Sequence, residues 1–374
     1  MSCAATGARL LGCAPRSNLG APWVARSIYG AAASGPNHLH HGHGHSPDGR
    51  CLPPPCASPP AAPDAPSPDR DQGYCAGLTR RFDYDGYLCS LHLPGVLRPT
   101  SLALRALNVE LAQAAAAGSR DPSLGLLRLA WWRSALEEAG RPGGRPKDHP
   151  VLRALAAAAA AAAASPGGEA AQSLFGGPLG RRWLHRLVEA REASLRRPAG
   201  PPPDLASVAG FAESTGGSLL CLLLESAGIR SSAADHAAGH VGAASALTGQ
   251  LRGVASAARA GHVLLPADLL LAKGVPEESV LRGQASEGLQ DVVLQVAAAA
   301  RGHLRAARAL DQGLPPGPAR AILLPAVPAG LYLDALEGLN FDVFSPAWAA
   351  GERAGVSPAW TQAQLWWHMW RGTY

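Results

Sequence analysis

The chain has 374 residues, of which 47% are hydrophobic, and it carries a formal net charge of +5. This apolar content is enough to bury a sizeable core, which excludes a wholly disordered chain. The positive charge is not gathered into a run of Lys or Arg interleaved with aromatic residues, so we expect no nucleic-acid partner.

The seven cysteines lie mostly in the first quarter of the chain and form no Cys-x-x-Cys pair. Zinc sites and redox centres usually show such a pair, and disulfide scaffolds are shorter and richer in cysteine. We therefore interpret these residues as reduced, structural or incidental thiols.

Residues 1–47 have the composition of a mitochondrial targeting sequence. They contain no Asp or Glu, while Arg9, Arg16 and Arg26 lie among Ala, Leu, Ser and Gly. A positive, acid-free segment of this kind is typical of import into mitochondria, and a secretory signal would need a continuous apolar stretch that is missing here. We predict a transit peptide over residues 1–47; the alternative is a disordered tail that lacks acids by chance.

A low-complexity segment overlaps the end of these residues and continues beyond them. Five histidines occur between His38 and His45, and a proline-rich tract extends to Pro63. Closely spaced imidazoles can chelate a metal ion, but the flanking Gly and Pro residues fix no geometry. A Pro/His-rich linker over residues 48–73 is therefore favoured over a metal site.

From residue 74 onward, apolar residues at three- and four-residue spacing predict a string of α-helices. Examples are the segments Leu102–Gln113, Trp183–Ala190 and Leu294–His303. Another helix should begin near Pro150 and carry the alanine run Ala156–Ala164, because proline fits the first turn of a helix. Few alternating runs of Val, Ile and Thr suggest strands, so the fold class is predicted to be all-α.

Gly- and Pro-rich breaks separate the predicted helices at residues 141–146, 165–168, 197–203 and 314–318. No piece between two breaks is large enough to close a core of its own. One helical domain over residues 74–345 is the simplest interpretation.

The C-terminal segment, residues 346–374, is rich in tryptophan. On a helix, Trp366 and Trp370 would share one face, with Trp367 beside them. We expect this segment to pack on the domain and its aromatic rings to complete the core. A role at a membrane interface or in partner docking is the alternative. The sequence contains no run of about 18 consecutive apolar residues, the length expected of a membrane-spanning helix. We therefore expect any membrane contact to be peripheral.

Several segments, in chain order, resemble the squalene/phytoene synthase family. They are Tyr84–Gln113, Arg128–Arg133, His149–Leu155, Leu187–Leu195 and Phe211–Glu225, followed by the best-defined match, GAASALTGQLRGV (Gly242–Val254) with GHVLLP (Gly261–Pro266). Together they cover residues 74 to about 345. The resemblance implies a single isoprenoid-synthase-type helical domain with a central apolar cavity.

Active members of that family ionise an allylic diphosphate, whose charge is neutralised by Mg²⁺ held between acidic residues on facing helices. Aspartates at i and i+4 place two carboxylates on one helix face. In this chain the acids of the second motif correspond to Gly253, Ser256 and Ala257, and its Gln and Asn positions to Ala246 and Gly249.

The acid pair of the first motif falls on Asn108 and Ala112 or, one turn later, on Ala112 and Ala116. Neither register gives two carboxylates. A separate acidic pair at this spacing, Glu287 and Asp291, is expected on a solvated helix face. We therefore expect a protein that is not an enzyme, with no catalytic, cofactor-binding or metal-binding residues and no cofactor.

A mitochondrial branch of the family shows the same loss of acids, and five phrases of this chain resemble it. These are DYDGYLCSLHLP (Asp83–Pro94), ALNVELAQ (Ala106–Gln113), ADHAAGHVG (Ala234–Gly242), FDVFSP (Phe341–Pro346) and the terminal Trp-Arg-x-Thr-Tyr (Trp370–Tyr374). The resemblance implies an early role in the assembly of respiratory complex I on the matrix side of the inner membrane. The expected partners are complex I subunits or assembly intermediates.

Two alternatives remain open: an active Mg-dependent prenyl-diphosphate transferase, and a protein that binds an isoprenoid or another lipid without turnover. In the second, Arg252 is a candidate for contacting a phosphate. A single arginine is weak evidence for an anion site, and a packing or surface position explains it equally well.

Overall fold

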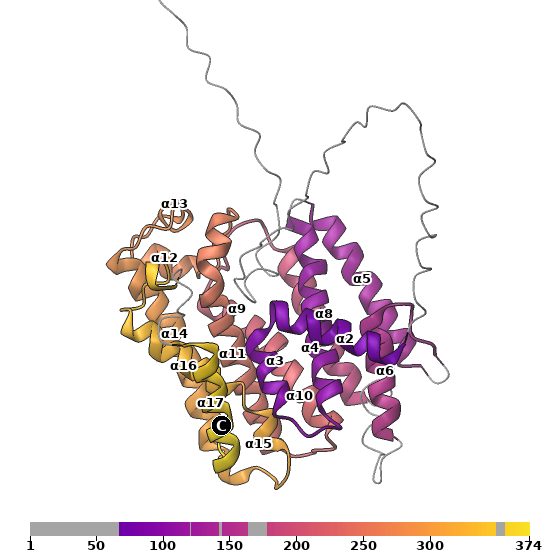
Figure 1. The fold of residues 1–374 in the computed structure, drawn as a ribbon. Coiled ribbons are helices and arrows are strands. Elements are labelled where there is room, and N and C mark those ends of the chain that lie inside the picture. The colour runs from indigo at the N-terminus through magenta and orange to yellow at the C-terminus, as the bar shows by residue number, and fades with distance from the viewer. Residues whose placement is uncertain (1–66, 120, 142–143, 164–177, 349–355) are drawn as a thin grey trace, which may run out of the picture.

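The computed structural model describes residues 67–119, 121–141, 144–163, 178–348 and 356–374, and every regular element in these ranges is a helix (Figure 1). The first half contains α2 (Pro68–Phe82), α3 (Tyr84–Leu91), α4 (Arg98–Ala116), η1 (Ala117–Ser119), α5 (Pro122–Ala139), α6 (Pro150–Ala163), α8 (Pro178–Arg196), α9 (Leu205–Ala212), the π-helix η3 (Glu213–Gly217) and α10 (Ser218–Ser226). The second half contains α11 (Ser232–Arg259), α12 (Ala267–Ala272), α13 (Glu277–Leu281), α14 (Glu287–Ala309), η4 (Asp311–Gly313), α15 (Ala319–Ile322), α16 (Ala326–Gly338), η5 (Pro346–Trp348) and α17 (Pro358–Arg371). The predicted all-α class is confirmed.

Side chains at the helix starts explain where several helices begin. The hydroxyl of Ser231 accepts a hydrogen bond from the Ala234 backbone N–H, and that of Ser286 accepts one from the Leu289 N–H. Each bond satisfies a donor that the first turn of a helix leaves unpaired. Pro150 begins α6, as the sequence predicted. The connections between α5 and α6, α8 and α9, and α14 and α15 coincide with predicted Gly/Pro breaks.

Helix α11 lies at the centre of the fold, in contact with α9, η3, α10, α14 and α16 (Figure 1). Its buried positions recur at helical spacing and form one apolar face. A continuous cluster of buried side chains extends from α2 to the C-terminus, so the described residues form one domain. The α11 members of this cluster include Ala237, Ala244, Leu247, Leu251 and Val254, each at most 1% exposed.

The helical domain starts earlier than residue 74. Helix α2 begins at Pro68, inside the segment expected to be linker, and Ser67 caps it by accepting a hydrogen bond from the Arg70 N–H. Proline at the first position and acidic residues in the first turn are ordinary helix-start signals, which the proline-rich context obscured. Asp71 is also buried against Arg153 of α6. The expected transit peptide, and the linker up to residue 66, lie outside the described residues.

The C-terminal helix α17 packs on the domain, but not through its tryptophans. Leu365 is fully buried in a small cluster with Leu88, Leu324 and Val327. The four tryptophans are instead between 47% and 71% exposed: Trp360, Trp366, Trp367 and Trp370. The expectation that these rings complete the core is therefore wrong, because Leu365 occupies the face that meets α16.

One helical stretch, Leu205–Ser226, is long and apolar enough to cross a membrane by length and composition alone. It runs through α9, η3 and α10, and 61% of its most apolar window is buried inside the fold. The core helix of a soluble protein passes the same test, so this stretch is weak evidence for a span.

Candidate functional site

A cavity of about 140 Å³ lies between α4, α8, α10 and α11, beside the π-helix η3. Part of its lining is apolar, with Phe211, Leu219, Leu220 and Ala246. The charged part and Asn108 come from α4, α8 and the start of α3: Asp83, Arg105, Asn108 and Arg191. The cavity therefore offers an apolar space next to charged groups, the arrangement that suits an amphiphilic ligand.

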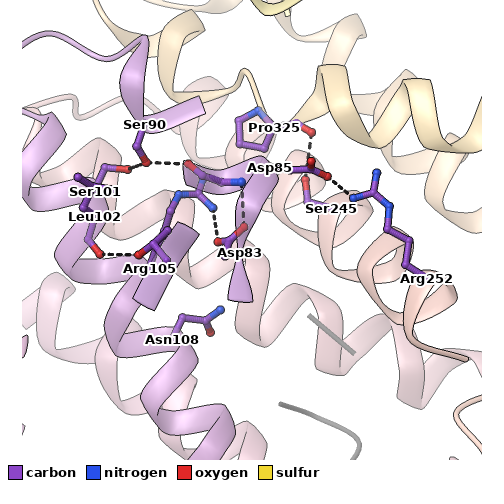
Figure 2. Close-up of polar contacts among 12 residues, drawn as sticks. Asp83, Asp85, Ser90, Ser101, Leu102, Arg105, Asn108, Ser245, Arg252 and Pro325 are labelled. Atoms are coloured by element: carbon purple, nitrogen blue, oxygen red, sulfur yellow. Dashed lines mark hydrogen bonds and ion pairs between the residues drawn. The ribbon is translucent and has the colours of Figure 1, made fainter. Parts of the chain in front are cut away.

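The two acidic residues at the start of α3 are each held by an arginine from a different helix (Figure 2). Asp83 precedes α3 and accepts the backbone N–H of Gly86 at 2.9 Å, which caps the helix. Its carboxylate also pairs with Arg105 of α4 at 2.8 Å, and both side chains are 8% exposed. In this pair the negative charge of Asp83 is balanced by the positive charge of Arg105.

Arg252 of α11 does not belong to the cavity lining but forms an ion pair with Asp85 of α3 (Figure 2). Its guanidinium also donates to the Pro328 carbonyl and lies 4.5 Å from the ring centroid of Tyr332. The interpretation of Arg252 as a phosphate contact gives way to the packing alternative, because its charge and its donors are used inside the fold.

Arg191 of α8 is the most deeply buried charge on the cavity wall, at 3% exposure. It donates to the Leu187 carbonyl at 2.7 Å and to the Asn108 side-chain oxygen at 2.5 Å. None of the ion pairs between described residues includes Arg191, and burial lowers the pKa of its guanidinium to about 10. A buried cation is thus held by neutral acceptors alone.

The π-helix η3 shapes the side of the cavity that faces α11. Thr215 and Gly216 line the cavity, and the Thr215 hydroxyl donates to the Phe211 carbonyl at 2.8 Å. The backbones of Gly216 and Gly242 approach so closely that a methyl group on either glycine would collide with the carbonyl of the other. A π-turn of this kind often marks a functional site, because it displaces backbone groups from the regular helix.

The motif positions identified in the sequence are distributed unevenly around the cavity. Asn108, Ala246 and Gly249 line it. Five others are not part of the lining: Ala112, Ala116, Gly253, Ser256 and Ala257. Glu287 and Asp291 lie on the exposed surface, where Asp291 pairs with Lys273 at 2.8 Å, as expected of a solvated face. Within the described ranges, no three His, Cys, Asp or Glu side chains are grouped so as to hold a metal ion.

Sequence reasoning missed Arg191, Arg105 and Asp83 as lining residues. A signal for Arg191 was present, because it continues the buried face of α8 that carries Leu184 and Leu187. A charged residue at a core position requires a partner or a ligand. The pairing of Asp83 with Arg105 has no comparable signal, since it depends on how α3 packs against α4.

Comparison with known proteins extends the structural picture. The squalene/phytoene synthase family model matches residues 79–360. Among curated relatives, "NADH dehydrogenase (ubiquinone) complex I, assembly factor 6 homolog" from Drosophila melanogaster is 34% identical, covering 72% of this chain and 76% of the relative. The assembly factor 6 proteins of Bos taurus and Homo sapiens are 34% and 32% identical; they cover 73% and 78% of this chain, and 76% and 81% of the relatives.

Solved structures agree on the fold. A dehydrosqualene synthase in complex with ligand superposes with a TM-score of 0.61 at 18% identity, covering 82% of this chain and 97% of that one. Squalene synthase HpnC from Alicyclobacillus acidocaldarius gives a TM-score of 0.58 at 17% identity, covering 74% and 96%. With a family model that spans most of the helical domain, the chain belongs to the squalene/phytoene synthase family.

Proposed function

We propose that this chain is an assembly factor for mitochondrial respiratory complex I that acts at an early step without catalysing prenyl transfer. Its partners are complex I subunits or assembly intermediates, and it works on the matrix side of the inner membrane. The names of the curated relatives support the assembly role; the three described above are 32% to 34% identical over about three quarters of the chain. The acid-free N-terminal segment supports delivery to mitochondria.

The proposal that the protein does not catalyse prenyl transfer rests on the ion pairs of Asp83 and Asp85. Asp83 lies on the cavity lining and Asp85 two residues further along the chain, and arginines from α4 and α11 neutralise both. Mg²⁺ beside a phosphorylated substrate is usually bound through one or two carboxylates together with the phosphates, and an arginine paired with those carboxylates competes with it. The motif positions that do line the cavity, Asn108, Ala246 and Gly249, carry no negative charge.

Depletion and rescue test the assembly role. Cells that lack the protein should lose mature complex I on a native gel, and expression of the full chain should restore it. A variant without residues 1–47 should fail to restore it, and the same variant fused to an unrelated mitochondrial presequence should succeed. Normal complex I in depleted cells would contradict the proposal.

The alternative of an active prenyl-diphosphate transferase is tested on the purified full chain. We expect no release of diphosphate from farnesyl or geranylgeranyl diphosphate in Mg²⁺, under conditions in which a dehydrosqualene synthase turns over. Sustained Mg²⁺-dependent release by this protein would establish an enzyme and overturn the non-catalytic part.

The exposed tryptophans of α17 support a peripheral membrane contact as part of this function. Trp366 and Trp370 are 69% and 71% exposed, and Arg371 lies 5.4 Å from the Trp367 ring. Two arginines, Arg308 and Arg371, lie close enough to His368 that their charges, together with burial, lower its pKa. Basic side chains therefore border the exposed tryptophans. Tryptophan beside arginine suits the headgroup region of an anionic membrane.

Vesicle flotation tests this contact. The full chain should float with vesicles that contain anionic phospholipid and less with neutral ones, and Trp366→Ser with Trp370→Ser should abolish flotation. Leu271→Ser is the matched control, since Leu271 is 84% exposed on α12 and should be dispensable. Equal flotation of the double variant and the control would contradict membrane contact through the tryptophans of α17.

A further inference from the structure

The cavity contains an uncompensated positive charge. Three charged side chains line it: Asp83, Arg105 and Arg191. Asp83 and Arg105 form an ion pair, so their charges cancel. Arg191 remains, and no ion pair between described residues involves it. The charged lining of the cavity therefore sums to one positive charge.

The hydrogen bonds of Arg191 leave part of its guanidinium unused. One terminal nitrogen donates to the Leu187 carbonyl, and the other donates to the carbonyl and side-chain oxygens of Asn108. The Nε–H is buried and has no acceptor among the described residues. All acceptors that Arg191 does have are neutral, although a guanidinium bonds most strongly to a carboxylate or a phosphate.

A cation in this position is costly unless something balances it. Buried charges in proteins are normally paired, because removing them from water is unfavourable. Burial lowers the pKa of Arg191 to about 10, and no neighbouring carboxylate opposes this shift. At neutral pH the group still carries its proton, so the cavity attracts an anion.

The rest of the lining determines what kind of anion fits. Phe211, Leu219 and Leu220 form an apolar surface, and small residues on η3 and α11 leave space beside it. A simple inorganic anion would leave this apolar surface in contact with water. A molecule with an apolar chain would cover it.

We propose that the cavity binds an amphiphile with one anionic headgroup, a carboxylate or a phosphate ester, whose charge pairs with Arg191 without a divalent metal. The protein itself supplies the cation that Mg²⁺ supplies in metal-dependent diphosphate binding. A carboxylate carries one negative charge and a phosphate monoester about 1.5 to 2 near neutral pH, so a diphosphate, which carries more, is a poorer fit to the single charge of Arg191. This inference does not depend on the assembly role or on membrane contact through α17.

Titration of lipid-stripped full chain in EDTA tests the proposal. The probes are oleate, farnesyl monophosphate and the neutral alcohol farnesol, followed by intrinsic fluorescence and thermal shift. At least one anion should bind and raise the melting temperature, and farnesol should bind at least about tenfold more weakly, as loss of a charge-assisted hydrogen bond implies. Preference for oleate or for farnesyl monophosphate shows which of these two anionic amphiphiles fits the cavity better. Binding that needs added Mg²⁺, equal binding of farnesol, or no binding of either anion would overturn the proposal.

Variants locate the site. Arg191→Met keeps an unbranched side chain and removes the charge, and it should weaken the preferred anion at least about tenfold. Arg182→Met changes an exposed arginine on the same helix and should bind like the unmodified chain. If Arg191→Met does not fold, Ala246→Leu gives an independent test, because it fills the apolar side of the cavity and should exclude the chain of the ligand. Unchanged anion binding by a folded Arg191→Met or Ala246→Leu protein would contradict binding of the ligand in this cavity.

Discussion

Asp85 and Arg252 are separated by 167 residues in the chain and form an ion pair that joins α3 to α11. Their side chains are 14% and 22% exposed, so the pair is largely shielded from water. Helix α3 is thus joined to the central helix α11 through Asp85 and to α4 through Asp83. The two pairs fix α3 to α4 and to α11, so both acids have a structural role.

The Asp85–Arg252 pair gives the first prediction. Arg252→Met leaves the Asp85 carboxylate without its partner, and we expect the free energy of unfolding in urea to fall by ~1–3 kcal/mol. Asp85→Asn should have a similar effect. The double variant should lose clearly less than the sum of the two, because each single change already breaks the same interaction. Strictly additive losses would show that the pair contributes nothing.

The crossing of η3 and α11 gives the second prediction. A Cβ atom on Gly242 would collide with the backbone of Gly216, so Gly242→Ala should force the helices apart and cost ~1–3 kcal/mol. Gly239 lies on the same helix and has open space at its Cβ position. Gly239→Ala should therefore stabilise the protein by ~0.5–1 kcal/mol through helix propensity. Opposite shifts in the urea midpoint are expected, and equal shifts would refute the packing argument.

Glu225 gives a pH-dependent prediction. Its side chain is buried; Trp183 donates to one carboxyl oxygen at 2.9 Å, and the other oxygen has no partner among the described residues. Burial raises the pKa of Glu225 from 4.5 to about 7, although the hydrogen bond from Trp183 opposes this shift. The folded state therefore holds the proton more tightly than the unfolded state. Stability from this group is full below pH 4.5 and is lost as pH rises through 7.

The measurement compares the unmodified chain with Glu225→Gln, which keeps an acceptor for Trp183 and cannot titrate. Between pH 5 and pH 8 the unmodified chain should lose roughly 2–3 kcal/mol relative to the variant. Burial lowers the pKa of His240 and His262, which makes stability change in the opposite direction, but these histidines are common to both proteins. Parallel pH profiles would rule out titration of Glu225 in this range.

Helical periodicity predicted much of the fold and little of the site. The segments expected around residues 102–113, 183–190 and 294–303 lie inside α4, α8 and α14, because each buries a stripe that repeats every three or four residues. Two features were not predicted from the sequence: the start of α2 at Pro68 and the π-helix η3. The first lies in a proline-rich context, and the second depends on the close approach of two glycine backbones from elements far apart in sequence.

The cavity shows the same division between local and long-range information. The family resemblance identified Asn108 as a motif position, and the structure places it on the lining. Its partner Arg191 is 83 residues away, and no local pattern links the two. The sequence also made Arg252 a candidate for an anion contact. In the structure the arginine without an ion pair on the cavity lining is Arg191, whereas Arg252 lies outside the lining and pairs with Asp85.

Asn108→Asp gives the last prediction, because it should change stability and ligand binding in opposite directions. The Asn108 side-chain oxygen lies 2.5 Å from an Arg191 nitrogen, so an aspartate of nearly the same shape would supply the missing counter-ion. We expect the lipid-stripped variant to be more stable by ~1–2 kcal/mol, since an ion pair replaces a hydrogen bond from the Arg191 cation to a neutral acceptor. The same carboxylate balances the charge of the cavity, so the affinity for the preferred anion should fall at least about tenfold. Asn108→Leu is the control: it removes the acceptor without adding charge, and it should destabilise the protein. If Asn108→Asp bound the anion as tightly as the unmodified chain, the positive charge of Arg191 could not be what attracts the ligand.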